Sequence, residues 1–87
     1  MYEVHLSQKA DKFLNKLNEN IKERVIDKLK ELAYTPVPTE AKFISRDEDG
    51  KIFRYRVGSL RALYKLKENS KIILITKIDK RPRIYHR

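Results

Sequence analysis

The residues best suited to chemistry in this sequence are arginines gathered in its second half. Arg54, Arg56 and Arg61 follow one another at short intervals, and Arg81 and Arg83 stand near the end of the chain. A guanidinium group stays protonated at ordinary pH and forms forked hydrogen bonds with phosphate oxygens. Like charges repel one another, so arginines crowded together indicate that an anion binds there. The set therefore favours a ligand with phosphate groups.

The surplus positive charge of the chain lies entirely in the same half. Residues 51–87 hold twelve lysines and arginines against two acidic residues, a balance of +10, whereas residues 1–50 hold nine against ten, a balance of −1. Such a local excess indicates a polyanion as partner. Tyr85 adds a ring that can stack on an unpaired base, so the set suits a single RNA strand. Lysine-rich faces also arise for solubility, and this alternative applies to Lys65, Lys67 and Lys71.

The rest of the composition excludes several kinds of site. The chain has no cysteine and only two histidines, His5 and His86, so we expect no zinc or other metal site, no thiolate nucleophile and no cofactor. Its longest aliphatic run, residues 72–75, is far shorter than the roughly 20 residues that span a bilayer, and the first residues lack the pattern of a secretory signal. We expect a cytoplasmic protein with no membrane partner, folded over residues 1–87 as a single domain.

The spacing of the apolar residues predicts the elements that must position the arginines. Residues 2–6 alternate as a short strand, and residues 8–17 have the periodicity of an amphipathic helix with Ser7 as its N-cap. A second amphipathic helix of about 13 residues follows Asn20, which is predicted to form a capping box with Glu23. The short link between the two helices predicts an antiparallel hairpin.

The second half of the chain is predicted to form most of the sheet. Pro36 and Pro38 end the second helix, and residues 39–50 are expected to cross irregularly to a turn. Alternation then predicts a meander of three strands at residues 51–57, 60–67 and 71–78. The fold class is therefore α+β, in the order β-α-α-β-β-β, with a helical hairpin packed on a mainly antiparallel four-stranded sheet.

The period of two along a strand decides which charges share a surface. In the first strand of the meander Phe53 and Tyr55 point one way, and Arg54 and Arg56 point the other. Pairing with the next strand brings Arg61 beside these two arginines. One face of the sheet is therefore expected to be apolar and covered by the helices, and the other to be basic and available for a ligand.

These residues resemble a known family of toxins. The segment Phe53–Tyr64, with the letters FRYRVGSLRALY, precedes an aliphatic strand and the letters KRPRIY at residues 80–85. Together they resemble the RelE/ParE superfamily of bacterial and archaeal toxins, and its RelE branch most closely. The resemblance is specific over residues 52–85 and generic in the helices, and the predicted order of elements is similar to the compact RelE-like microbial RNase fold.

The resemblance implies a function and a set of partners. It implies the toxin of a type II toxin–antitoxin system, which enters the A site of a translating ribosome, cuts the mRNA there as an endoribonuclease and so inhibits translation. It also implies a cognate antitoxin that silences the toxin by wrapping around it, so that a toxin–antitoxin hetero-oligomer forms.

The resemblance further implies roles for individual residues. Arg61 falls on the phosphate-binding arginine of the family, and Arg81 and Tyr85 fall on an arginine and a C-terminal tyrosine of its active site. With Arg54, these residues are expected to be catalytic: they would offset charge on the phosphate and orient the base while a ribose 2′-oxygen attacks, without a metal ion. Contacts with RNA or the ribosome are expected from the following residues: Arg56, Lys65, Lys80, Arg83 and His86.

More than one residue could transfer the protons, and more than one kind of target fits these features. Some RelE toxins have lysines where this chain has Arg54 and Arg56, and arginine is a poor general base because it stays protonated. Our hypothesis is that Tyr85 or His86 takes the proton instead, since an unperturbed histidine has a pKa of about 6.5. The alternatives are that Tyr85 only packs the end of the chain and that His86 has no role. Two other functions share these features: a ParE-like inhibitor of DNA gyrase without nuclease activity, and an RNA-binding module without catalysis. The C-terminal tyrosine after a basic run favours the nuclease.

Overall fold

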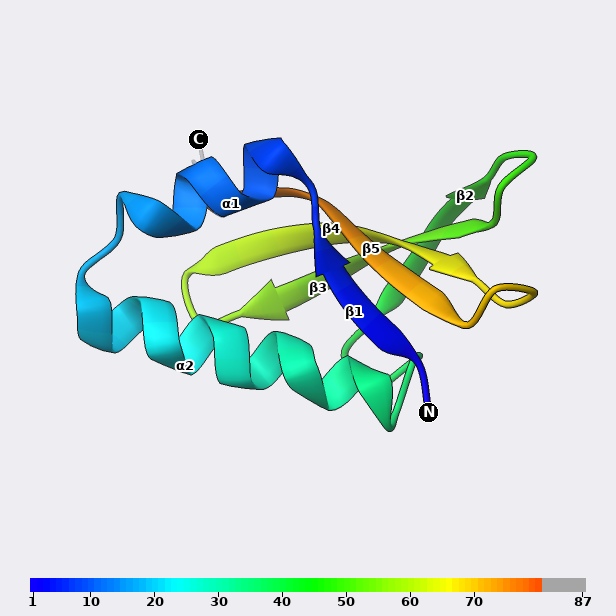
Figure 1. Cartoon of the computed structure of the whole chain (residues 1–87), viewed down its shortest axis with the longest axis horizontal. Coiled ribbons are helices and arrows are strands. Elements are labelled where there is room, and N and C mark those ends of the chain that lie inside the picture. Colours follow the sequence, from blue (N-terminus) through cyan, green and yellow to red (C-terminus); the bar gives the residue numbers. More distant parts are fainter. Residues whose placement is uncertain (81–87) are drawn as a thin grey trace, which may run out of the picture.

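The structure is a computed structural model that describes residues 1–80 of the chain. Two helices lie against one face of a five-stranded sheet (Figure 1). The strands are β1 (Glu3–Leu6), β2 (Lys42–Arg46), β3 (Lys51–Val57), β4 (Leu60–Lys67) and β5 (Ile72–Lys80). They lie in the order β1-β5-β4-β3-β2, and neighbouring strands are antiparallel except for the parallel pair β1 and β5. The predicted α+β class is confirmed, with one strand more than expected.

The first helix, α1 (Gln8–Asn15), begins where the sequence predicts and ends before the predicted Leu17. Its N-cap is Ser7, whose Oγ atom accepts a hydrogen bond from the backbone N–H of Ala10 at 3.0 Å. The same hydroxyl donates a hydrogen bond to the backbone oxygen of Thr76 in β5 at 2.9 Å. One serine therefore starts the helix and fixes that start to the sheet.

The second helix, α2 (Glu19–Lys30), begins two residues earlier than predicted. Its N-cap is Asn18, whose Oδ1 accepts a hydrogen bond from the backbone N–H of Asn20 at 2.8 Å. Asn20 thus lies inside the first turn, so the predicted capping box with Glu23 is wrong. A short 3₁₀ helix, η1 (Glu31–Ala33), continues from α2. None of the helices within residues 1–80 combines the length and the apolar character that crossing a membrane requires.

Strand β2 lies in the segment that was expected to be irregular. All five of its side chains are exposed, because β2 forms an edge of the sheet described by residues 1–80 and pairs there with β3 alone. Its residues therefore lack the alternation of buried and exposed positions that reveals a strand in a sequence. A bulge adds to this, since Phe43 pairs with Phe53 and Ser45 with Ile52, which leaves Ile44 between two pairs.

The face of the sheet that the helices cover supplies the hydrophobic core. Its buried residues form one cluster: Ala10, Leu14, Val25, Leu29, Leu32, Phe53, Tyr55, Leu60, Ala62, Tyr64, Leu66, Ile73, Ile75 and Ile78. The rings of Phe53 and Tyr64 stack on neighbouring strands with their centroids 5.4 Å apart. The hydroxyl of Tyr64 donates a hydrogen bond to the backbone oxygen of Pro36 at 2.6 Å, which fixes the proline-containing segment to the sheet.

The opposite side of the sheet carries the polar residues of the three central strands. We call it the arginine face and define it by the residues that alternate with the core positions: Ile52, Arg54, Arg56, Arg61, Leu63, Lys65, Leu74, Lys77 and Asp79. The helices α1 and α2 both lie on the other side of the sheet (Figure 1). The fold therefore separates the hydrophobic core from the predicted binding residues by the thickness of one sheet.

Candidate functional site

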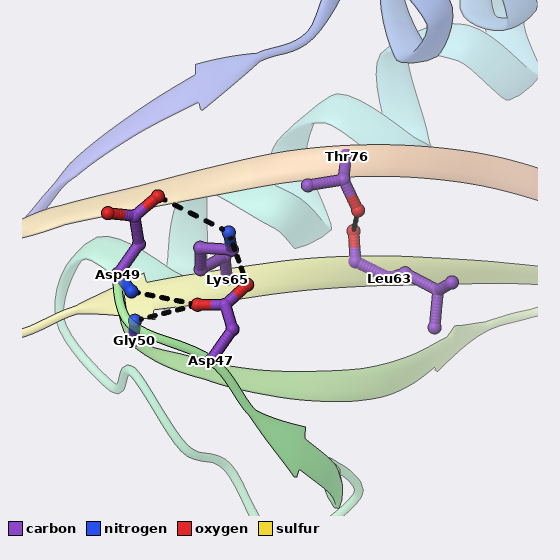
Figure 2. A network of polar contacts seen from close by, with 6 residues as sticks. All are labelled: Asp47, Asp49, Gly50, Leu63, Lys65 and Thr76. Carbon is purple, nitrogen blue, oxygen red and sulfur yellow. Dashed lines mark hydrogen bonds and ion pairs between the residues drawn. The ribbon is translucent and has the colours of Figure 1, made fainter.

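A bulge in β5 decides which of its side chains join the arginine face. Ile73 and Ile75 are buried at an interval of two residues, but the next buried residue, Ile78, follows at an interval of three. Thr76 is the extra residue, since the register between β4 and β5 shifts there. Its hydroxyl donates a hydrogen bond to the backbone oxygen of Leu63 at 3.1 Å, which stabilises the bulge from the neighbouring strand (Figure 2).

The bulge reverses the alternation along the rest of β5. Without it, Lys77 and Asp79 would share the core face with Ile73 and Ile75, because all four occupy odd-numbered positions of one strand. With it, Lys77 pairs with Leu63 and Asp79 pairs with Arg61, so both side chains lie on the arginine face. Bulges re-aim side chains in this way near many functional sites.

Arg56, Arg61 and Asp79 form a row across the three strands of this face. Arg61 in β4 pairs with Arg56 in β3 on one side and with Asp79 in β5 on the other. Two like charges directly opposite one another on neighbouring strands destabilise a sheet, and a carboxylate on the far side of Arg61 offsets that repulsion. The row therefore combines two guanidinium groups with one carboxylate.

Asp79 accepts two hydrogen bonds from one edge of the Arg61 guanidinium. Arg61 Nε donates to Asp79 Oδ1 at 3.1 Å, and Arg61 Nη2 donates to Asp79 Oδ2 at 3.1 Å. The ammonium of Lys77 also lies 3.5 Å from Asp79 Oδ2. The hydrogen bonds from Arg61 lower the pKa of Asp79, and the same bonds raise the pKa of Arg61. The pair is therefore fully charged at neutral pH, and its side chains remain about a quarter exposed, at 27% and 29%.

Arg54 lies next to this row, near the middle of the face. In β3 it pairs with Leu63 of β4 on one side and with Lys42 of β2 on the other. Its Nε atom is buried and has no hydrogen-bond partner among residues 1–80. A buried N–H group without an acceptor costs about 1–3 kcal/mol, so this group is suited to donate a hydrogen bond to an oxygen of a ligand.

Lys65 lies between two carboxylates of the turn that joins β2 and β3, as Figure 2 shows. Its Nζ atom is 2.7 Å from Asp47 Oδ2 and 3.7 Å from Asp49 Oδ2, and only 16% of the side chain is exposed. Asp47 Oδ1 in turn accepts hydrogen bonds from the backbone N–H groups of Asp49 and Gly50. The hydrogen bond from Lys65 lowers the pKa of Asp47. Lys65 therefore holds this turn on β4.

The structure brings together only part of the predicted site. It places Arg54, Arg56 and Arg61 on one face, as the strand alternation predicts, and it leaves Arg56 exposed. Lys80, at the end of β5, is exposed as well. The other predicted residues lie outside the described part of the chain: Arg81, Arg83, Tyr85 and His86.

Three residues of the site were missed by sequence reasoning. Lys42 was missed because β2 was not predicted. Lys77 was missed because the residues of the predicted strand 71–78 were assigned to no face, and Asp79 was missed because it lies beyond the predicted end of that strand, whereas β5 extends to Lys80. A signal for the last two exists in the sequence, since the change of interval at Ile75 and Ile78 is the pattern of a bulge.

Comparisons with known proteins agree with this geometry. A family model described as the ParE toxin of type II toxin–antitoxin systems, parDE, matches residues 4–85. The archaeal RelE–RelB complex from Pyrococcus horikoshii contains a chain that is 28% identical, with a TM-score of 0.85 over 95% of this chain and 98% of that chain. The toxin–antitoxin complex RelBE2 from Mycobacterium tuberculosis contains one that is 27% identical, with a TM-score of 0.76 over 92% and 98%.

A more distant structure shares the fold alone. The isolated RelE toxin of E. coli is 19% identical, with a TM-score of 0.77 over 97% of this chain and 88% of that chain. No curated protein gave a significant match. The likeness in fold thus extends over nearly the full length of each of these chains.

Proposed function

The chain belongs to the RelE/ParE family of type II toxin–antitoxin toxins, and from that premise we propose that it is a ribosome-dependent endoribonuclease that cuts mRNA in the A site and inhibits translation. The observation that carries this proposal is the grouping of Arg54, Arg56 and Arg61 on the face of the sheet opposite the helices. Guanidinium groups clustered in this way suit the phosphates of an RNA chain. The buried, unpartnered N–H group of Arg54 adds a donor for one phosphate oxygen.

The proposed chemistry is the attack of a ribose 2′-oxygen on the adjacent phosphate. The new bond joins the 2′-oxygen to phosphorus, the bond from phosphorus to the 5′-oxygen breaks, and the RNA is left with a 2′,3′-cyclic phosphate and a free 5′-hydroxyl. Arg54 and Arg61 offset the charge that develops on the non-bridging oxygens. Arg56 and Lys80, both exposed, contact neighbouring phosphates of the message or the ribosome, and Lys65 contributes by holding the turn at residues 47–50.

The proton transfers are assigned to the end of the chain. A base must remove the proton of the 2′-hydroxyl and an acid must protonate the leaving 5′-oxygen. Arginine cannot act as the base because its pKa lies far above neutrality. We keep Tyr85 and His86 as candidates for these transfers and Arg81 as a further positive charge at the phosphate, all three outside the described residues.

A cognate antitoxin is the second proposed partner. The related chains from P. horikoshii and M. tuberculosis were solved in toxin–antitoxin complexes. A partner that presents acidic side chains to the arginine face would neutralise its charge and keep RNA away from it. We therefore propose that the chain forms a hetero-oligomer with such an antitoxin in the resting cell.

The decisive experiment maps the 5′ ends of mRNA after brief expression of the toxin. The wild type is expected to produce new ends within translated codons, and Arg61→Ala is expected to reduce them about 100- to 1,000-fold, the usual effect of losing one donor to a transition-state oxyanion. Lys12→Ala is the matched control, since it also removes one positive charge and Lys12 is exposed on α1 on the other side of the sheet. Both variants must show an unchanged far-UV circular dichroism spectrum. Growth arrest by Arg61→Ala equal to that by the wild type would refute the assignment.

The family match also favours a second candidate. The matching family model is that of a ParE toxin, and a ParE-like inhibitor of DNA gyrase would have the same fold. Induction of a DNA-damage response with intact messages and continued translation would support that function and exclude the nuclease.

A further inference from the structure

The guanidinium of Arg61 can donate from two edges, and Asp79 occupies one of them. Nε and Nη2 form the side edge of a guanidinium, while Nη1 and Nη2 form its end edge. The two hydrogen bonds to Asp79 use the side edge, with one bond from Nε and one from Nη2. The two protons of Nη1 and the second proton of Nη2 are directed away from this carboxylate, as the planar geometry of the group requires. The end edge can therefore receive two oxygens of a phosphate while Asp79 stays in place.

We propose that Asp79 is a positioning residue: it holds the side edge of Arg61 so that the end edge is presented to the phosphate at which the RNA is cut. This inference rests on the proposed nuclease function. It assigns to Asp79 no contact with RNA and no proton transfer, because its carboxylate acts through Arg61 alone.

The surroundings of Asp79 explain why a carboxylate at this position controls the arginine. An arginine side chain loses rotamer entropy when it is fixed, and Arg61 is also repelled by Arg56 on the neighbouring strand. The Asp79 side chain is short, lies on β5 opposite Arg61 of β4, and is itself contacted by Lys77. A fork of two hydrogen bonds fixes both the position and the plane of the guanidinium.

The bulge at Thr76 is what makes this contact available. It brings Asp79 to the arginine face, and the hydroxyl of Thr76 fixes the bulge to Leu63 on β4. The local structure is therefore built to place an acidic residue on a face that otherwise attracts a polyanion. On electrostatic grounds alone Asp79 opposes RNA binding there, because its charge repels phosphates.

Because Asp79 both orients Arg61 and repels phosphates, its removal is expected to change kcat and KM in different ways. In a reconstituted assay with programmed ribosomes, Asp79→Asn is expected to lower kcat about tenfold to a hundredfold, since a misplaced catalytic group costs rates of this order. The KM is expected to stay unchanged or to fall, because a repelling charge has been removed. Glu23→Gln, the same change of charge at an exposed position on α2, is expected to leave both constants unchanged. Asp79→Glu keeps the carboxylate and is expected to recover part of kcat.

A second readout reports the position of Arg61 without any cleavage. In protein labelled with ¹⁵N, the Nε–Hε signal of Arg61 is expected to be sharp in the wild type, because this N–H donates to Asp79, and to broaden by exchange with water in Asp79→Asn. Addition of a short, uncleavable RNA is expected to shift the Nη signals of Arg61 in the wild type while its Nε signal stays in place. Thermal unfolding of each variant shows that the fold is retained.

The two readouts separate the possible failures. An unchanged kcat in Asp79→Asn, or an Arg61 Nε signal that is equally sharp in both proteins, overturns the positioning role. If the wild type cuts no message at all, the proposed nuclease function is overturned, and the Nε signal alone then decides whether Asp79 fixes Arg61. A fall in KM together with a rise in kcat would show that Asp79 acts only as a repelling charge, which also overturns the proposal.

Discussion

Arg61 and Asp79 show how a single ion pair can serve both stability and a binding face. Both side chains are partly shielded from solvent, and two hydrogen bonds join them, so the pair is screened less than an isolated pair on the surface. The sequence predicted that Arg61 binds phosphate, but it did not predict its partner. A strand of strictly alternating residues has no place for Asp79 beside Arg61, and only the bulge at Thr76 provides one.

Acid is expected to remove the stability that Asp79 supplies. Its pKa is lowered in the folded state, so the folded protein binds this proton less tightly than the unfolded chain does. The stabilisation is therefore fully present above the ordinary aspartate pKa of about 3.9 and is lost as the pH falls through the lowered value. Urea unfolding is expected to show that the wild type is more stable than Asp79→Asn at pH 7, and that the difference closes as the pH falls below the ordinary aspartate pKa and through the lowered one. A difference that does not depend on pH would contradict this.

The buried hydroxyl of Tyr64 leads to a second prediction about a single residue. Tyr64→Phe removes the donor to the backbone oxygen of Pro36 and leaves that oxygen unpaired beside the core. The expected loss is about 1–3 kcal/mol in the free energy of unfolding, measured by chemical denaturation at neutral pH. Tyr34→Phe serves as the control, because Tyr34 is 76% exposed and is expected to change the stability little.

At the scale of elements, the two central strands followed most directly from the sequence. β3 and β4 occupy the predicted residues 51–57 and 60–67, because their side chains alternate strictly between the core and the arginine face. β2 could not be predicted, since an edge strand with all its side chains exposed leaves no periodic signal. The cap of α2 was missed for a different reason: Asn18 and Asn20 offer the same side chain two residues apart, and only the backbone conformation distinguishes them.

The turn between β2 and β3 gives a prediction at this scale. Lys65→Ala removes the ammonium that lies between Asp47 and Asp49, so the turn is expected to open more often. The backbone N–H groups of Asp49 and Gly50, which donate to Asp47, should then exchange with deuterium faster, while the core of the sheet stays protected.

Lys12→Ala is the matched control for this experiment. Lys12 is exposed on α1, away from the turn between β2 and β3, and its removal changes the charge by the same amount. It is expected to leave exchange in residues 47–50 unchanged. Equal exchange rates in the wild type and Lys65→Ala would show that the two carboxylates hold the turn without the lysine.

At the scale of the whole molecule, the sheet divides the protein into two layers with different tasks. The helices and the core lie on one side, and the arginines lie on the other (Figure 1). Composition and strand alternation predicted this division, because the surplus of positive charge is confined to the half of the chain that forms three strands of the sheet. The contribution of β2 to the arginine face, through Lys42 beside Arg54, emerged only from the register of the folded sheet.

If this surface binds RNA, the logarithm of the association constant is expected to fall linearly with the logarithm of the salt concentration. Each phosphate neutralised on a single strand contributes about 0.7 to the slope, so Arg54→Ala and Arg61→Ala are each expected to reduce it by about that amount. Fluorescence anisotropy with a short unstructured RNA measures this slope. Lys9→Ala, on the exposed side of α1, is expected to leave it unchanged. Equal slopes for all four proteins would place the RNA elsewhere.

The parallel pairing of β1 with β5 has a consequence for the timing of folding during synthesis. Glu3 pairs with Ile72 and Leu6 pairs with Ile75, so β1 can pair only after a partner about 70 residues further along the chain has been made. Contacts between such distant positions form late, because a long loop must close before they can. A nascent chain interrupted before residue 72 has neither a completed sheet nor the carboxylate that holds Arg61. Premature stop codons and synthesis that stalls before β5 are therefore expected to yield harmless fragments, and the cell is exposed to the toxin only after β5 has been translated.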